Sequence, residues 1–336
     1  MLEMQGKNNV YITRLIPAAG LDYLQEFCQC RFWERENEPV PHEVLLKEVA
    51  NAEGLYCMLS DKIDASVINA APHLKVISTM AVGYDHIDLA AATQRGITVT
   101  HTPGVLTETT ADLAFALMMA ASRRLMEANR AIYQGQWKTW SPLFMAGRDV
   151  HGASLGIIGL GRIGEAMARR ARGFRMRICY YSRQRRENLE KELGLSYMPL
   201  DELLQYSDFV SLHVPATVDT FQLISTREFN LMKPNAVLIN TARGSVVDEE
   251  ALFAALISGQ IRAAGLDVFS EEPVNPDHPL LQLPSVVALP HMGSASLETR
   301  NNMAYMAAED MVAVLAGSPP QFPVPGTEPQ DTQRKD

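Results

Sequence analysis

The chain has 336 residues, enough for roughly two domains of ordinary size. Hydrophobic residues make up 47% of it and charged residues 21%, a composition that is typical of globular proteins and excludes disorder over most of the length. Its formal net charge of −9 argues against a general nucleic-acid binder, whose binding surface is basic. The longest strictly apolar run, residues 113–121, is much shorter than the ~20 residues that span a bilayer, so we expect no membrane segment.

The cysteines and the opening sequence bear on the cellular compartment. The four cysteines show no C-x-x-C spacing, and MLEMQGKNNVYITRL lacks the basic-then-apolar order of a signal peptide. We therefore expect reduced thiols and a cytoplasmic protein. The eight histidines show no clustering of the metal-ligand kind, so we predict no metal site.

Short apolar runs alternate with helical patterns from the start of the chain, which is typical of βαβ units and a parallel sheet. Strands are expected over residues 10–16, 31–33, 55–59, 76–80 and 98–100. Helices are expected between them, over residues 17–27, 41–50 and 65–70. Pro17 and Pro41 suit the first turn of a helix, where a missing N–H costs nothing.

A second series of strands begins near residue 154 and predicts a doubly wound sheet. Its members are expected over residues 154–158, 177–181, 209–214, 236–240, 263–268 and 286–289. Between the two series, residues 107–133 contain no Gly or Pro, so we expect one long helix that joins two domains. The last helix, residues 296–315, is expected to pack back on the first domain. The predicted bounds are 1–102 with 291–317 for a discontinuous first domain, 103–290 for the second, and 318–336 for a flexible tail.

The most specific local motif is a glycine-rich turn that follows an apolar strand and opens a helix. It consists of Gly159, Leu160, Gly161, Arg162, Ile163 and Gly164. In this context GxGxxG is the dinucleotide-binding fingerprint. The first glycine makes the tight turn, the second lets the backbone approach the pyrophosphate, and the third lets the helix pack on the strand. The pyrophosphate would then lie at the helix N-terminal amides, which favour anions.

The end of the next strand bears on which dinucleotide binds. NAD-binding proteins carry an acid there for the ribose hydroxyls, but this chain has Ser182 and no acid before Glu187. A carboxylate would repel a 2′-phosphate, whereas hydroxyl and guanidinium groups bind it. We therefore predict NADP(H) as the preferred cofactor, with NAD(H) as the alternative. The predicted contacts are Ser182, Arg183, Gln184 and Arg185, a solvated charge run being the alternative for the arginines.

Three further polar side chains each follow a different strand of the second series, at the carboxyl end where open α/β sheets bind ligands. They are Arg243, Glu272 and His291. Beside a nicotinamide site, this set favours hydride chemistry on an anionic carbonyl compound. An imidazolium can protonate the carbonyl oxygen, a neighbouring carboxylate favours the charged imidazole, and a guanidinium can hold a substrate carboxylate.

The chain resembles the D-isomer specific 2-hydroxyacid dehydrogenases over residues 10–316. The segments that carry the resemblance are VGYDHID (82–88), HTPGVLTETTADLAFALMMAASRRL (101–125), GLGRIG, TARGSVVDE (241–249), AAGLDVFSEEP (263–273) and LPHMGSAS (289–296). The resemblance implies an α/β protein with a flavodoxin-like substrate domain and a Rossmann NAD(P)-binding domain. It also implies that Arg243, Glu272 and His291 form the active site.

The resemblance implies further contacts around these three residues. The backbone amides of Val82 and Gly83 are implied to grip the substrate carboxylate, and Asp267 to meet the nicotinamide carboxamide. The other predicted cofactor contacts in this region are Thr241, Ala242, Arg243, His291 and Gly293. The predicted substrate contacts are Val82, Gly83, Arg243, His291 and Trp140.

Within the family, the glyoxylate/hydroxypyruvate reductase branch is most similar, because it shares the Ser-Arg pair at 182–183 and the segment GQWKTWSPL at 135–143. In related enzymes the second Trp of that segment reaches the active site of the neighbouring subunit. Trp140 is therefore a candidate substrate contact across a homodimer interface, with simple interface packing as the alternative. The expected activity is NADPH-preferring reduction of glyoxylate or hydroxypyruvate to glycolate or D-glycerate, with His291 as general acid.

Two other functions stay open at this point. One is another D-2-hydroxyacid dehydrogenase, acting on 2-ketogluconate, D-lactate or phosphoglycerate. The second is a non-catalytic nucleotide-sensing scaffold, which would keep the same three residues and would bind the nucleotide without turnover. Formate dehydrogenases of this fold carry Gln where Glu272 stands, so Glu272 argues against them.

Overall fold

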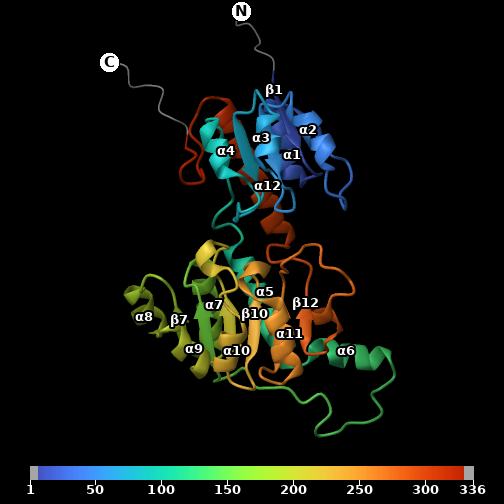
Figure 1. Cartoon of the computed structure of the whole chain (residues 1–336), viewed down its shortest axis with the longest axis vertical. Helices are drawn as coiled ribbons and strands as arrows, with labels where there is room; N and C mark the ends of the chain where they lie inside the picture. Colours follow the sequence, from blue (N-terminus) through green and yellow to red (C-terminus); the bar gives the residue numbers. More distant parts are fainter. Residues whose placement is uncertain (1–6, 329–336) are drawn as a thin grey trace, which may run out of the picture. The chain divides into compact units, whose positions relative to one another are not determined.

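The computed structural model describes residues 7–328 and divides the chain into two compact units (Figure 1). The first unit comprises Met1–Leu106 with Ala295–Asp336, and the second comprises Thr107–Ser294. The chain thus crosses between units after residues 106 and 294, where the sequence predicted 102 and 290. As a result His291, which was predicted at the start of a first-domain segment, lies in the second unit.

The first unit is built on a five-stranded parallel sheet in the order β2-β1-β3-β4-β5, the flavodoxin-like order. Its strands are β1 (Asn8–Ile12), β2 (Cys28–Phe32), β3 (Gly54–Cys57), β4 (Val76–Thr79) and β5 (Thr98–Thr100). Every residue of β3 and β4 is buried, because helices cover both faces of a parallel sheet.

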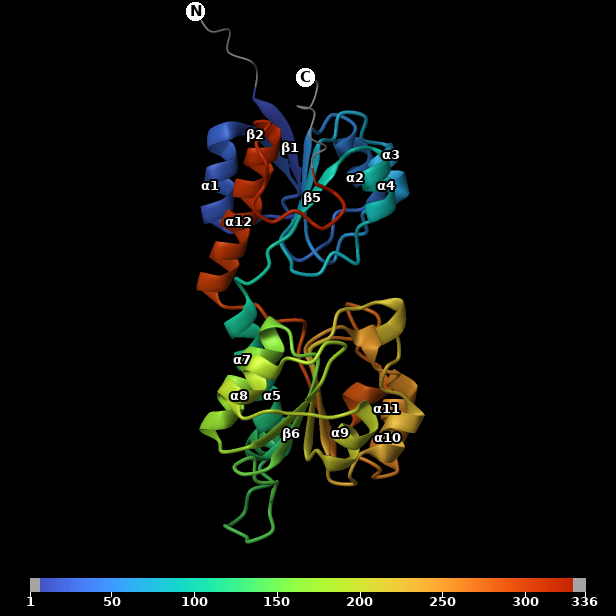
Figure 2. The same ribbon diagram turned by 90° about the vertical axis from the view of Figure 1, so that its left-hand side faces the viewer.

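Helices lie on both faces of this sheet (Figure 2). One face carries α1 (Ala18–Phe27) and α12 (Leu297–Leu315), and the other carries α2 (His42–Val49), α3 (Ala65–Asn69) and α4 (Leu89–Gln94). The last helix packs on α1 so closely that a Cβ on Gly20 would lie 2.6 Å from the carbonyl oxygen of Ala304. Helix α4 was not predicted from the sequence, although Asp88 caps it by accepting the N–H of Ala91, a common start signal.

The part of the predicted flexible tail that the structure describes, residues 318–328, packs on the first unit. The Val324 N–H donates to the carbonyl of Val99 at 2.7 Å, and the His101 N–H donates to the carbonyl of Phe322 at 3.2 Å. The Val324 side chain is fully buried in the core. The prediction was wrong here because the edge of β5 supplies partners that composition alone does not reveal. Residues 329–336 of the predicted tail lie outside the described residues.

The second unit contains a seven-stranded parallel sheet in the order β12-β11-β10-β9-β6-β7-β8. Its strands are β6 (Ser154–Ile158), β7 (Arg177–Tyr181), β8 (Ser196–Tyr197), β9 (Phe209–Leu212), β10 (Val237–Asn240), β11 (Ala263–Leu266) and β12 (Val286–Ala288). The chain winds outward from β6 in both directions, which is the doubly wound Rossmann topology that the sequence predicted. The added edge strand, β8, has two residues and carries no period that sequence analysis could detect.

Two layers of helices sandwich this sheet (Figure 2). One layer holds α5 (Thr107–Ser122), α7 (Arg162–Gly173) and α8 (Glu187–Leu193), and the other holds α9 (Leu200–Tyr206), α10 (Thr226–Leu231) and α11 (Glu249–Ile257). Each layer closes its own hydrophobic core against the sheet. Three short 3₁₀ helices complete the unit: η1 (Val218–Thr220), η2 (Gly244–Val246) and η3 (Pro279–Gln282).

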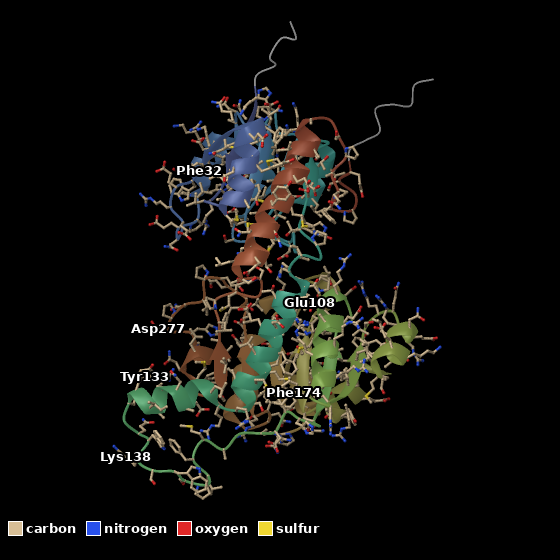
Figure 3. All side chains as sticks on the ribbon, turned by 180° about the vertical axis from the view of Figure 1, so that it is seen from behind. Phe32, Glu108, Tyr133, Lys138, Phe174 and Asp277 are labelled. Atoms are coloured by element: carbon tan, nitrogen blue, oxygen red, sulfur yellow. The ribbon has the colours of Figure 1, made fainter. Side chains whose placement is uncertain are left out.

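The predicted single helix over residues 107–133 is two helices, α5 and α6 (Leu125–Tyr133). Arg124 adopts a left-handed conformation with φ 55° and ends the first helical run. Residues from farther along the chain hold the break, since the Arg148 N–H donates to the carbonyl of Ser122 at 2.9 Å. Figure 3 shows Tyr133 at the end of α6 and Lys138 on the segment that follows. Over residues 7–328 no helix is both long and apolar enough for a membrane span.

Candidate active site

The glycine-rich turn between β6 and α7 has the geometry that its spacing predicts. Gly159 has φ 97°, and a Cβ there would lie 2.5 Å from the carbonyl oxygen of His213. A Cβ on Gly164 would lie 2.2 Å from the carbonyl oxygen of Gly159, so the helix packs directly on the turn. A Cβ on Gly161, in contrast, would meet nothing within 4 Å. The open space thus lies at the N-terminus of α7, where first-turn amides lack helical acceptors, and it fits a pyrophosphate.

The other residues of this turn differ in exposure. Leu160 is buried and belongs to the core beneath the turn, while Arg162 is exposed as the first residue of α7. Ile163 is half-buried. Only the arginine of these three therefore presents a charged side chain to solvent at the helix N-terminus.

The turn after β7 holds the residues that were predicted to contact a 2′-phosphate. The Ser182 hydroxyl donates to the carbonyl of Gln184 at 2.5 Å, which closes the turn. Arg183 is exposed and makes no ion pair with any residue in the described part of the chain. Arg185 is different, because its guanidinium forms two 2.8 Å hydrogen bonds with the carboxylate of Glu190. The Arg183 guanidinium is therefore open to an anion, whereas the charge of Arg185 is already paired with a carboxylate and two of its N–H donors are in use.

A Glu–His pair lies at the carboxyl ends of β11 and β12. Oε2 of Glu272 lies 2.6 Å from Nδ1 of His291, and Oε1 accepts the backbone N–H of Phe269 at 2.9 Å. Burial would raise the pKa of the Glu272 carboxyl, but the hydrogen bond with His291 and the charges of His291 and Arg243 hold that pKa below its usual value. The carboxylate therefore stays ionised and engages Nδ1, which leaves Nε2 for proton exchange with a substrate.

The backbone of His291 is held in a left-handed conformation, with φ 51°. Such a conformation in a non-glycine residue costs about 1–3 kcal/mol, so neighbouring contacts must hold it. Asp267 supplies them from the end of β11. Its carbonyl accepts the His291 N–H at 2.9 Å, and its Oδ1 accepts the Met292 N–H at 2.8 Å. Asp267 thus fixes the turn that presents the imidazole.

Asp267 also carries an unsatisfied group that fits a cofactor. It is fully buried, and its Oδ2 has no hydrogen-bond partner among the described residues. Burial raises the pKa of this carboxyl above its usual value, against the opposing influence of the Met292 and Gly293 backbone N–H groups and the charge of His291. A buried carboxylate oxygen normally has a donor, and a carboxamide NH₂ would supply one. The buried hydroxyl of Thr241 likewise has no partner in the described part of the chain.

Two residues near Asp267 frame the same space. A Cβ on Gly293 would lie 3.3 Å from Oδ2 of Asp267 and 3.4 Å from the methyl carbon of Thr110. Gly293 was predicted as a cofactor contact, whereas Thr110 on α5 was not. Thr110 carried no signal that sequence reasoning could use, because it lies inside a helical run and only the fold brings it to the end of β11.

Arg243 is the N-cap residue of the 3₁₀ helix η2 and lies three residues after the end of β10. Asn240, the last residue of that strand, fixes this loop: its Nδ2 donates to the Arg243 carbonyl at 2.9 Å, and its Oδ1 accepts the Ala242 N–H at 3.0 Å. A Cβ on Gly244 would lie 1.9 Å from the carbonyl carbon of Phe269, so the arginine loop packs directly against the loop of Glu272. Three separate strand ends thus bring Arg243, Glu272 and His291 into one region. Asn240 was not among the site residues predicted from the sequence.

Two other groups of predicted contacts lie away from this cluster in the chain. Val82 and Gly83 are in the first unit, in the loop after β4, where Nδ1 of His101 donates to the Val82 carbonyl at 2.9 Å. Trp140 lies between α6 and β6, and its side chain is 80% exposed. Their roles toward a substrate stay predictions. Among the residues that the structure describes, no group of three or more His, Cys, Asp or Glu side chains is arranged to hold a metal ion.

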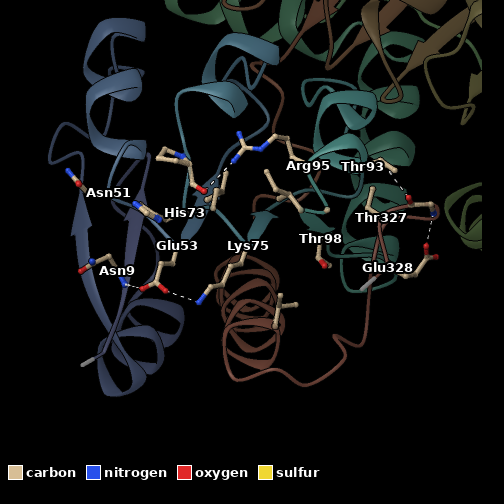
Figure 4. Close-up of a pocket in the computed structure, with 16 residues that line it drawn as sticks. Asn9, Asn51, Glu53, His73, Lys75, Thr93, Arg95, Thr98, Thr327 and Glu328 are labelled. Atoms are coloured by element: carbon tan, nitrogen blue, oxygen red, sulfur yellow. Dashed lines mark hydrogen bonds and ion pairs between the residues drawn. The ribbon is translucent and has the colours of Figure 1, made fainter. Parts of the chain in front are cut away.

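A pocket of about 1100 Å³ lies in the first unit, near the amino ends of β3, β4 and β5 (Figure 4). Lys75 and Arg95 in its lining are already engaged. Lys75 lies 2.8 Å from Glu53, and Arg95 donates to the carbonyls of Ile68 and Ala71 at the end of α3. Open parallel sheets bind ligands at the opposite, carboxyl ends of their strands. We therefore place the candidate site at the cluster of the second unit.

The second unit thus places an imidazole–carboxylate pair and a guanidinium at the ligand-binding edge of a Rossmann sheet, next to a dinucleotide turn. This combination defines the class of nucleotide-dependent oxidoreductases. Comparison with known proteins gives the same class. The family model described as "D-isomer specific 2-hydroxyacid dehydrogenase, NAD binding domain" matches residues 115–293.

Relatives extend the match to almost the whole chain. A glyoxylate reductase of Korarchaeum cryptofilum is 53% identical over 315 residues, covering 94% of this chain and 95% of the relative. A crystal structure of an NADPH-dependent glyoxylate/hydroxypyruvate reductase from Sinorhizobium meliloti, in complex with NADP and malonate, matches with a TM-score of 0.83 and 35% identity, covering 96% of this chain and 98% of that one. The chain belongs to the D-isomer specific 2-hydroxyacid dehydrogenase family, and it is an oxidoreductase.

Proposed function

We propose that the protein is a cytoplasmic, homodimeric reductase that uses NADPH in preference to NADH. Its substrates are glyoxylate and hydroxypyruvate, which it converts to glycolate and D-glycerate. The observation that carries the proposal is the 2.6 Å contact between Glu272 and His291 at the cofactor edge of the sheet. The names of the relatives from Korarchaeum and Sinorhizobium support the choice of substrate.

The glycine turn, Thr241 and Asp267 have the donors, acceptors and open space that fit a nicotinamide dinucleotide. When bound in its reduced form, this group supplies a hydride. Ala242 and Gly293 belong to the loops that carry Arg243 and His291, so their backbone would line the same site.

The remaining chemistry belongs to the side chains of this cluster. Arg243 binds the substrate carboxylate and polarises the neighbouring carbonyl, and the amides of Val82 and Gly83 are further proposed carboxylate ligands. His291 donates its Nε2 proton to the carbonyl oxygen as negative charge develops there. Glu272 stabilises the imidazolium through Nδ1 and keeps the ring oriented. Once a hydride has been delivered to the carbonyl carbon, this proton would convert the developing alkoxide into the hydroxyl group of the product, whose carboxylate stays ionised.

The cofactor preference depends on the turn after β7. Ser182 occupies the position where a carboxylate would repel a 2′-phosphate, and Arg183 is an exposed guanidinium without an ion-pair partner among the described residues. We propose that both contact the phosphate, with Gln184 beside them. A ratio of kcat/KM that favours NADPH over NADH supports this assignment, and a ratio that favours NADH overturns it.

The homodimer is supported by apolar side chains on α6 and the segment that follows. The most exposed of them are Ile132 at 60%, Tyr133 at 84%, Trp137 at 60%, Trp140 at 80% and Leu143 at 82%. Large apolar groups gathered in one region mark association surfaces. Light scattering should give about twice the 37.2 kDa chain mass for the wild type, and a Tyr133→Ser/Leu143→Ser double variant should dissociate. A wild type with the mass of one chain would overturn the dimer.

The decisive experiment is a panel of 2-keto acids tested with both cofactors. Glyoxylate-dependent oxidation of NADPH with kcat of about 1 s⁻¹ or more is an ordinary enzyme rate and supports the proposal. A higher kcat/KM for 2-ketogluconate, pyruvate or phosphohydroxypyruvate would assign another substrate. Nucleotide binding without turnover of any acid would indicate a nucleotide-sensing scaffold.

A further inference from the structure

The turn that carries Ser182 and Arg183 is fastened to the rest of the second unit by three side chains, Tyr180, Arg185 and Glu190. We propose that Arg185 is a positioning residue and not a ligand of the cofactor phosphate. In this arrangement Tyr180, Arg185 and Glu190, here called the turn clamp, hold the turn so that Arg183 meets the 2′-phosphate. The inference rests on the proposed NADPH preference.

The first part of the clamp is a two-point ion pair. Nε of Arg185 lies 2.8 Å from Oε1 of Glu190, and Nη2 lies 2.8 Å from Oε2. Two parallel hydrogen bonds fix the plane of the guanidinium, which a single contact does not. The Arg185 guanidinium also lies over the ring of Tyr197, 5.9 Å from its centroid. Two of its five N–H donors and one face of its guanidinium plane are therefore engaged, which fixes how the side chain is oriented.

The second part is the hydroxyl of Tyr180, a fully buried residue of β7. It donates to Oε1 of Glu190 at 2.7 Å and accepts the backbone N–H of Arg186 at 2.7 Å. This one hydroxyl thus links the strand before the turn, the last residue of the turn and the helix α8 after it. Both hydrogen bonds of this hydroxyl depend on the backbone conformation of the turn. They therefore stabilise that conformation over residues 182–186.

Within the clamp, the opposite charges of Arg185 and Glu190 largely neutralise each other. Glu190 accepts hydrogen bonds from Arg185 and Tyr180, and these lower the pKa of its carboxyl to about 2. The Glu190 side chain is only 14% exposed, while that of Arg185 is 57% exposed. An ion pair at this exposure contributes little to stability by its charge. The ion pair matters for geometry, since it neutralises Arg185 and leaves Arg183 and Arg186 as the arginines of the turn that form no ion pair with a described residue.

A held turn matters because binding a phosphate with an exposed arginine otherwise costs the entropy of ordering that side chain and its backbone. If the clamp already orders the turn in the free protein, a variant without the clamp should bind the phosphate more weakly and bind the adenosine as well as the wild type does. Removing Glu190 also frees Arg185. A ligand role and a positioning role for Arg185 therefore predict opposite effects of Glu190→Gln.

The test measures binding of two nucleotide halves by calorimetry. The probes are 2′,5′-ADP, which carries the 2′-phosphate, and 5′-AMP, which does not. The variants are Arg183→Ala, Arg185→Ala, Glu190→Gln, Tyr180→Phe and the Arg185→Ala/Glu190→Gln double variant. The control is Glu192→Gln, because Glu192 is also on α8 and pairs at 2.8 Å with Arg169, outside the turn. Melting temperatures show whether each variant is folded, and Tyr180→Phe keeps the ring that fills the core.

We expect Arg183→Ala to abolish the preference for 2′,5′-ADP. Arg185→Ala and Glu190→Gln should each weaken 2′,5′-ADP binding by about tenfold, the size of a lost charge-assisted contact, and the double variant by no more than either. Tyr180→Phe should act in the same direction, and binding of 5′-AMP should stay unchanged in all of them. If Glu190→Gln strengthens or preserves 2′,5′-ADP binding while Arg185→Ala abolishes it, Arg185 is the ligand and the proposal fails.

Hydrogen exchange of the backbone amides tests the proposed clamp independently of the proposed NADPH preference. In the nucleotide-free protein, Glu190→Gln and Tyr180→Phe should speed exchange of the amides at 182–186, and Glu192→Gln should not. If the wild type binds both probes equally but the variants show this exchange pattern, the proposed NADPH preference is wrong and the proposed clamp is supported. Unchanged exchange in both clamp variants overturns the clamp, whichever cofactor the wild type prefers.

Discussion

Oε2 of Glu272 lies 2.6 Å from Nδ1 of His291, while the other carboxylate oxygen is held by the N–H of Phe269. The carboxylate is therefore fixed from one side and directed at the imidazole from the other. Glu272→Gln keeps the shape and a hydrogen-bonding group but removes the negative charge. We expect the alkaline limb of the kcat/KM profile for keto-acid reduction to move to lower pH, because the imidazolium loses its stabilising neighbour. A profile that coincides with that of the wild type would show that Glu272 does not act on His291.

Replacing His291 tests the acid itself. His291→Ala should lower kcat for reduction by about 10²- to 10⁴-fold, the usual contribution of a general acid. The nucleotide turn lies on β6 and α7, so the Kd for the cofactor should change much less than kcat. Rapid-mixing measurement of the reduction step, with cofactor binding measured separately, distinguishes the two. A variant with the kcat of the wild type would remove His291 from the proposed role.

Arg243 offers a test of geometry as well as charge. Arg243→Lys retains a cation but loses the planar fork that binds a carboxylate at two points. We expect KM for the keto acid to rise and kcat to fall together, with Arg243→Ala more severe than Arg243→Lys. Steady-state kinetics with glyoxylate and with a neutral aldehyde of similar size provide the control, since the neutral compound loses only the polarisation of its carbonyl and should be less sensitive to either change. Equal losses for both compounds would argue that the guanidinium does not bind the carboxylate.

Sequence reasoning succeeded where one local signal sufficed. The strands at 98–100, 154–158 and 177–181 were predicted to the residue, because each is a short stretch with β-branched, aromatic or other apolar residues bounded by turn residues. Arg243, Glu272 and His291 were predicted to converge because parallel strands carry their carboxyl ends to one edge. The pairing of Glu272 with His291 follows from that convergence.

Sequence reasoning failed where distant residues decide the outcome. The helix break at Arg124 has no Gly or Pro and depends on a hydrogen bond from Arg148. The segment around Val324 packs because β5 has a free edge, although its prolines suggested a flexible tail. The ion pair of Arg185 with Glu190 was likewise not predicted, because no local pattern states which partner an arginine chooses; the contact of Arg185 with a phosphate stays a prediction.

Two glycines of the nucleotide turn should respond oppositely to the same substitution. Gly161→Ala places its methyl group in open space, so the melting temperature should stay close to that of the wild type while KM for the cofactor rises sharply. Gly164→Ala forces the methyl group against the Gly159 carbonyl and should destabilise the protein by about 1–3 kcal/mol, as overpacking does. Thermal unfolding and cofactor titration of both variants check this contrast. A Gly161→Ala variant with unchanged cofactor affinity would place the pyrophosphate elsewhere.

Asp267 links stability to pH in a direction set by its environment. Burial raises its folded-state pKa above the ordinary aspartate value of about 3.9, so the fold favours the neutral carboxyl. The contribution of Asp267 to the free energy of unfolding is therefore fully present when the pH is below its unfolded-state pKa. This contribution is lost as the pH rises through the folded-state pKa. Asp267→Asn cannot ionise and keeps an oxygen for the Met292 N–H. Its stability relative to the wild type should therefore increase as pH rises from about 4 to neutral, which urea unfolding at several pH values measures.

The same substitution should weaken the cofactor site. The partnerless Oδ2 of Asp267 becomes an NH₂ group that no longer accepts a hydrogen bond from a carboxamide, so KM for the cofactor should rise even as the protein becomes more stable. Functional sites commonly retain such destabilising groups because the ligand satisfies them. An Asp267→Asn variant that loses stability at neutral pH would mean that the ionised carboxylate is well accommodated by the Met292 N–H and the charge of His291. The unsatisfied oxygen would then no longer support a cofactor contact at this position.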